Sequence, residues 1–116
     1  MDSDLSIVFW NVRGLNSWAK RTAVRSVISS ARPCIVCLQE TKLELVSSSL
    51  VSETLGASFG DFFFLPATGT CGGILLAWDS TKIALSHPEI SSYHASALVT
   101  PLSGNQHWWL SGVYGP

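Results

Sequence analysis

The sequence predicts an α/β fold with a mixed β-sheet and flanking helices. Residues 5–39 run strand, helix, strand, whereas the later residues form short apolar segments separated by turn residues. Hydrophobic residues make up 47% of the 116 residues and charged residues only 13%, which is typical of a chain that buries a core and excludes a disordered one. We expect a single domain over residues 1–116, because the length suits one domain and no linker or repeat interrupts the chain.

The first forty residues predict a crossover between two parallel strands. Residues 5–11 are apolar and rich in β-branched and aromatic side chains, and residues 34–39 form a second run of this kind. Between them, residues 18–31 carry apolar side chains at helical spacing, after residues that can cap a helix and before Pro33. A strand–helix–strand unit favours parallel pairing, so both strands should end at the same edge of the sheet.

The remaining elements are mostly strands. Turn residues at 103–106 separate the last two strands and predict a hairpin, and glycine-rich residues 68–73 predict a tight turn. Helices cover one side of these apolar strands only thinly, so we expect a second layer that this chain does not contain. We predict a helix over residues 43–55, and strands over residues 62–65, 74–78, 82–86, 95–102 and 108–114.

Polar side chains follow both strands of the predicted parallel pair. Asn11 ends the first strand and Glu40 follows the second, so we expect the two to lie close together although 29 positions separate them. A carboxylate can bind a hard cation such as Mg²⁺, and an amide can orient an anionic group. The ordinary alternatives are a surface carboxylate for Glu40 and a turn residue for Asn11; both interpretations remain open for Asn11.

Other suggestive patterns predict no site. Cys34 and Cys37 should point to opposite faces of a strand and therefore pack rather than bind a metal. The glycine-rich residues 68–73 lack the Gly-Lys-Ser/Thr ending of a phosphate-binding loop. The three histidines have no metal-ligand spacing and should lie on the surface or on a strand face: His87, His94 and His107.

The charge is distributed unevenly along the chain. Residues 1–42 contain six basic and three acidic residues, a sum of +3, and residues 43–116 contain one basic and five acidic residues, a sum of −4. The basic part is a weak footprint for a nucleic acid. The acidic first residues do not resemble a secretory signal, and the apolar runs are too short to cross a membrane. With three cysteines, these features predict an intracellular protein of the nucleus or cytoplasm.

Four segments in a fixed order carry a family resemblance. They are WNVRGLN at residues 10–16, LQETK at residues 38–42, GGILLAW at residues 72–78 and GVYGP at residues 112–116. Together they resemble the amino-terminal part of an endonuclease/exonuclease/phosphatase domain. Within that superfamily the chain is most similar to the apurinic-endonuclease-like domain of plant non-LTR retrotransposons.

The resemblance implies a fold, a reaction and three site residues. The fold would be a partial four-layer α/β sandwich, and the reaction Mg²⁺-dependent hydrolysis of phosphodiesters, with DNA as the substrate that is nicked. Glu40 would be the Mg²⁺ ligand, and Asn11 would lie near the phosphate and support the catalytic acidic groups. The hydroxyl of Tyr114 would lie near the scissile phosphate, although from the sequence alone Tyr114 is a packing aromatic.

The chain departs from the family by lacking its later motifs. An Asp-x-Asn segment and a terminal Ser-Asp-His segment are absent, so we expect the chain alone to be inactive as an endonuclease. We also expect exposed apolar strands, which would favour self-association or pairing with a missing carboxyl-terminal half. Two alternatives remain: a non-catalytic remnant or interaction module that binds a partner through these strands, and a superfamily member that acts on phosphoinositides or nucleotides.

Overall fold

The computed structural model describes residues 6–69, 71–91, 93–104 and 106–113. Its first sheet is mixed, as predicted, with the strand order β1-β2-β4-β3. β1 and β2 are parallel, with Asn11 opposite Gln39, and β4 is antiparallel to both of its neighbours. The four strands are β1 (Ile7–Asn11), β2 (Ile35–Gln39), β3 (Asp61–Leu65) and β4 (Ile74–Trp78).

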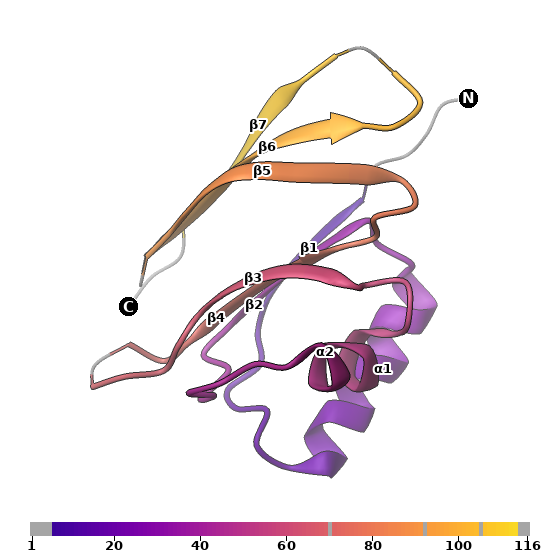
Figure 1. Cartoon of the computed structure of the whole chain (residues 1–116). Coiled ribbons are helices and arrows are strands. Elements are labelled where there is room, and N and C mark those ends of the chain that lie inside the picture. The colour runs from indigo at the N-terminus through magenta and orange to yellow at the C-terminus, as the bar shows by residue number, and fades with distance from the viewer. Residues whose placement is uncertain (1–5, 70, 92, 105, 114–116) are drawn as a thin grey trace.

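Two helices cover one face of this sheet (Figure 1). α1 (Trp18–Ala31) begins where the Ser17 hydroxyl accepts a hydrogen bond from the amide of Lys20, and its bounds agree with the predicted ones. α2 (Ser48–Leu55) is shorter than predicted, because the side chain of Ser47 caps it and so fixes its start. The apolar stripes of both helices pack on Val36 and Leu38 of β2.

The later strands form a separate antiparallel sheet, in the order β5-β6-β7. β6 and β7 form the predicted hairpin. β5 extends beyond its predicted end, because the pairing shifts register between Ser86 and Glu89, where His87 has a φ of 55°. The three strands are β5 (Ile83–Ile90), β6 (His94–Pro101) and β7 (Trp108–Val113).

The second layer that we expected to be missing is present in the chain, and that expectation was wrong. The β5-β6-β7 sheet packs against the face of the first sheet that the helices leave free (Figure 1). Because successive side chains of a strand alternate between faces, β2 directs Ile35 and Cys37 toward the second sheet and Val36 toward the helices. The described residues therefore form three layers, in the order helices, mixed sheet, antiparallel sheet.

Both buried cysteines contribute to the core between the sheets. Cys34 and Cys37 belong to the same apolar cluster, which corrects the prediction that they point to opposite faces. The reason is that β2 begins only at Ile35, so the alternation of a strand does not extend to Cys34. Both thiols are free, and burial raises the pKa of Cys37 to about 12. The prediction that both side chains pack in the core is confirmed.

Apolar exposure is confined to a few positions instead of covering a whole sheet face. Phe9 on β1 is 41% exposed, and on β7 Trp109 is 60% and Val113 82% exposed. β1 and β7 are edge strands of their sheets. Neither helix of the described residues is long and apolar enough to cross a membrane.

Candidate functional site

Asn11 and Glu40 are in direct contact at one edge of the first sheet, as predicted. The Asn11 Nδ2 donates a hydrogen bond of 2.7 Å to Glu40 Oε2. The parallel register explains the contact: Asn11 lies opposite Gln39, the last residue of β2, so Glu40, which follows the strand, comes alongside the end of β1. The other polar atom of the amide, Asn11 Oδ1, accepts a hydrogen bond of 3.1 Å from the backbone of Arg13. The Asn11 side chain is therefore oriented from both of its ends.

The backbone at this edge is held in an uncommon conformation. Arg13, Glu40 and Lys42 have φ values of 55°, 54° and 61°. They are three of the five non-glycine residues with positive φ in the described part of the chain. Such strained positions persist where the surrounding structure determines them, and they are frequent at functional sites.

Hydrogen bonds between two loops fix these conformations. The amide of Gly14 donates to the carbonyl of Glu40 at 2.7 Å, and the amide of Leu15 donates to the carbonyl of Thr41 at 2.8 Å. The Asn16 side chain adds a bond of 3.1 Å to the carbonyl of Lys42. The loop after β1 and the loop after β2 therefore form one hydrogen-bonded unit.

Two glycines before β4 also accept hydrogen bonds from the loop after β2. The amides of Thr41 and Lys42 donate to the carbonyls of Gly73 and Gly72, at 3.1 Å and 2.7 Å. A Cβ at Gly72 would lie 3.1 Å from Glu40 Cγ and 3.2 Å from its Cα. A side chain at residue 72 would therefore have to displace Glu40 by a few tenths of an ångström, so this close approach favours glycine. The sequence predicted only a tight turn at these glycines and gave no indication of their contact with Glu40.

The electrostatics of the edge combine one carboxylate with a nearby cation. Lys42 Nζ lies 3.9 Å from Glu40 Oε1, and both side chains are about half exposed, so the pair is weak. Lys42 also lines a hollow of about 280 Å³ together with Thr68 and Gly72. Within the described residues, no group of three or more histidine, cysteine or acidic side chains could hold a metal ion. Glu40 thus presents a single carboxylate at this edge, and a metal bound there would need further ligands from elsewhere.

The remaining predicted site residue and the three histidines, to which the sequence assigned no site, do not add to this edge within the described residues. Tyr114 is outside the described residues. His87 and His94 lie on strands of the second sheet, and each hydrogen-bonds a serine hydroxyl, as expected of histidines on a strand face. His107 contacts the hydroxyl of Thr100. The histidines therefore belong to the second sheet and take no part in the Asn11–Glu40 site.

Comparison with known proteins shows a structural similarity but no sequence match. No protein-family model matches the chain, and no curated protein sequence does. Among solved structures, the chain is similar to the AP endonuclease from Leishmania major, with a TM-score of 0.59 and 20% sequence identity. The match covers 93% of this chain and 39% of that one.

The chain has part of the AP endonuclease fold. This similarity confirms the truncated α/β sandwich predicted from the sequence. At 20% identity the similarity establishes the AP endonuclease fold and not an activity. The chain spans about two fifths of the length of that neighbour, so the activity of the whole neighbour enters only as a proposal.

Proposed function

We propose that the chain is a fragment of a Mg²⁺-dependent phosphodiesterase, derived from a retrotransposon endonuclease that nicks target DNA, and that it is inactive alone. The observation that carries the proposal is the contact between Asn11 and Glu40 at the end of the parallel strand pair. The AP endonuclease fold supports a nuclease ancestry. The retrotransposon origin rests on the resemblance of the four sequence segments, above all WNVRGLN at residues 10–16.

The residues at the edge suit Mg²⁺ as one side of its coordination shell. Mg²⁺ is usually bound by one or two carboxylates, with water and substrate phosphate completing six oxygen ligands. Glu40 would supply the carboxylate, and its side chain is 40% exposed, which leaves room for the other ligands. A bound Mg²⁺ would supply positive charge to stabilise the phosphate as it reacts.

The neighbouring side chains have positioning roles in this proposal. Asn11 holds one oxygen of Glu40 by donating a hydrogen bond, so the second oxygen can turn toward a cation. Lys42 places a positive charge beside that second oxygen. Because this ion pair is weak, the Lys42 ammonium could instead bind a phosphate group. Tyr114, by resemblance, would place its hydroxyl near the phosphate. A base to activate water would have to come from outside the described residues.

Binding of a short DNA duplex with and without Mg²⁺ tests the proposal. By fluorescence anisotropy at constant ionic strength, we expect the affinity to rise several-fold in millimolar Mg²⁺ relative to EDTA, because the cation bridges carboxylate and phosphate. Glu40→Gln should abolish this dependence on Mg²⁺. Glu44→Gln is the matched control, since Glu44 is exposed and lines only the neighbouring hollow. A Mg²⁺ effect that is absent, or that persists in Glu40→Gln, would contradict the proposal.

Nicking of supercoiled plasmid tests the expected inactivity. One carboxylate cannot hold metal, water and phosphate together, so the purified chain with Mg²⁺ should nick no faster than its Glu40→Gln variant. Efficient nicking that Glu40→Gln removes would show that the chain contains a complete active site.

An interaction module without catalysis is the second candidate function. It is favoured by the apolar side chains on the two edge strands, Phe9 on β1 and Trp109 and Val113 on β7. In that case sedimentation velocity should detect concentration-dependent self-association, and Phe9→Ser should reduce it while the duplex binding described above remains independent of Mg²⁺.

A further inference from the structure

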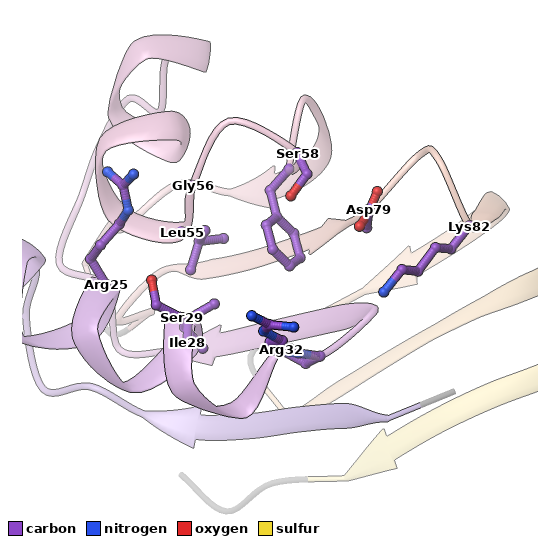
Figure 2. A pocket seen from close by; sticks show the side chains of 11 residues that line it. Arg25, Ile28, Ser29, Arg32, Leu55, Gly56, Ser58, Asp79 and Lys82 are labelled. Atoms are coloured by element: carbon purple, nitrogen blue, oxygen red, sulfur yellow. The ribbon is translucent and has the colours of Figure 1, made fainter. Parts of the chain in front are cut away.

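A second charged cavity lies at the opposite end of the first sheet from Glu40. It has a volume of about 300 Å³ and is formed by the last turns of α1, the loop after α2 and the turn between β4 and β5 (Figure 2). Pro33, just before β2, and Asp79, just after β4, both line it. Because β2 and β4 are antiparallel, the start of β2 and the end of β4 lie side by side. Pro33 and Asp79 therefore lie at the same end of these strands, and Glu40 lies at the other end of β2. We call this cavity the basic pocket.

Three cations from different segments line the basic pocket. Arg25 and Arg32 come from α1 and its carboxyl-terminal cap, and Lys82 comes from the turn before β5. Lys82 is the only basic residue in residues 43–116, yet the fold places it beside the basic helix. Among the residues that the structure describes, Asp79 is the only acidic one that lines the pocket, so the formal charge of the described lining is +2.

Two of the four described charged side chains that line the pocket already have hydrogen-bond partners within the chain. Arg25 Nη1 donates to the carbonyl oxygens of Ser52 and Glu53 at the end of α2, at 3.4 Å and 3.2 Å. Asp79 Oδ1 accepts from both the amide and the hydroxyl of Thr81, at 3.0 Å and 2.6 Å. Arg25 therefore caps a helix, and Asp79 fixes a turn.

Arg32 and Lys82 are the available pair. Their side-chain nitrogens have no hydrogen-bond or ion-pair partner in the part of the chain that the structure describes. Figure 2 shows the two side chains extending from separate walls toward the same space, with Ser29 and Ser58 also at the rim. Two like charges directed at one cavity repel each other unless an anion lies between them.

We propose that the basic pocket binds a phosphate group between Arg32 and Lys82. A guanidinium can donate two parallel hydrogen bonds to phosphate oxygens, and a lysine ammonium adds a compact charge. The buried apolar side chains of Ile28, Leu55 and Phe59 also line the cavity and can pack against the uncharged part of a phosphate ester. The site lies at the other sheet edge from Glu40, so it does not depend on the proposed phosphodiesterase function.

Titration of the ¹⁵N-labelled chain with inorganic phosphate at low ionic strength tests the site by NMR. We expect saturable shifts at the amides around Arg32 and Lys82. Arg32→Gln and Lys82→Gln should each weaken binding by about five-fold or more, as expected for loss of a charge-assisted hydrogen bond. Lys20→Gln, which removes a cation of α1 outside the pocket, should leave the affinity unchanged. Because the side chains of Arg32 and Lys82 are exposed, we expect both variants to fold, and thermal unfolding of each variant verifies this.

Asp79→Asn gives a prediction of opposite sign. It removes the one negative charge among the described lining residues and keeps an oxygen for Thr81, so phosphate should bind about two- to five-fold more tightly. Weaker binding in Asp79→Asn would overturn the proposal, as would unsaturable shifts or an equal effect of Lys20→Gln. Equal shifts with acetate would also overturn it, because they would show a general anion effect.

A second titration distinguishes two sources of the phosphate group. If a short DNA duplex produces the same shifts, and Arg32→Gln removes them, the pocket takes a phosphate of the nucleic-acid backbone. If only inorganic phosphate produces them, the pocket takes a small free phosphate rather than the nucleic-acid backbone. Both results support a phosphate site.

Discussion

At the end of β1, the Asn11 side chain uses both of its polar atoms, one on Glu40 and one on the backbone of Arg13. This arrangement could be anticipated from the sequence, because a parallel strand pair brings its two carboxyl ends to one edge. The residue that follows β2 must then lie beside the last residue of β1. The strained φ values at Arg13 and Glu40 could not be anticipated, since both residue types usually adopt negative φ.

The buried thiol of Cys37 predicts a loss of stability at alkaline pH. Burial raises its pKa from 9.0 to about 12, so between these values the folded chain keeps a proton that the unfolded chain releases. The free energy of unfolding should therefore fall as the pH rises above about 9, by up to about 1.4 kcal/mol per pH unit from this group. Urea unfolding at pH 8, 9 and 10 measures the decline.

Two alanine variants assign that decline to one thiol. Cys37→Ala should make the decline shallower, whereas Cys71→Ala should leave it unchanged, because Cys71 is half-buried at a loop. An equal decline in the wild type and in Cys37→Ala would show that other groups cause it.

Among the structural elements, the segment before β4 makes the least tolerant contact with the candidate site. Gly73 has a φ of 91°, and a Cβ there would lie 2.5 Å from Thr41 Oγ1 and 3.3 Å from Ala67 Cβ. Gly73→Ala should therefore lower the free energy of unfolding by about 2 kcal/mol or more, through strain and overlap together. Gly60→Ala is the matched control, because its Cβ would meet nothing within 4 Å and its φ is not positive. Urea denaturation that shows equal losses for the two variants would contradict this role of Gly73.

The elements that the sequence predicted well are those with a periodic signal or a capping residue. α1 shows an apolar stripe, a Ser17 cap and Pro33 beyond its end, and its bounds agree with the prediction. The contact between Gly72 and Glu40 leaves no such signal, because it joins backbone segments 32 positions apart and involves no side chain of residue 72. The predicted strand over residues 82–86 ends where a bulge at His87 interrupts the pairing, and β5 continues beyond that bulge.

For the whole molecule, the principal correction concerns how the later strands pack. Their existence was predicted, but the partner of their inner face was not. Ala95 and Ala97 on β6 are buried against the first sheet, and small side chains of this kind carry little hydrophobic contrast in a sequence. As a result the chain buries a core on both faces of β2 and β4, and we expect the apolar face between the sheets to remain covered without a partner chain.

The arrangement of the layers also separates the two charged regions of the molecule. Glu40 and Asn11 lie at one end of the parallel pair, and the basic pocket with Arg32 and Lys82 lies at the other. Substitutions at the two ends have no shared contacts and should therefore act independently.

Paramagnetic relaxation by Mn²⁺ gives the most direct test of whether Glu40 and Asn11 form a cation site. Mn²⁺ accepts the same oxygen ligands as Mg²⁺ and broadens the NMR signals of nearby nuclei. In the 116-residue chain, we predict the strongest broadening at the side-chain amide of Asn11 and the backbone amides of residues 40–42, and its disappearance in Glu40→Gln. Broadening that centres elsewhere, or that Glu40→Gln leaves unchanged, would contradict a metal site at the ends of β1 and β2.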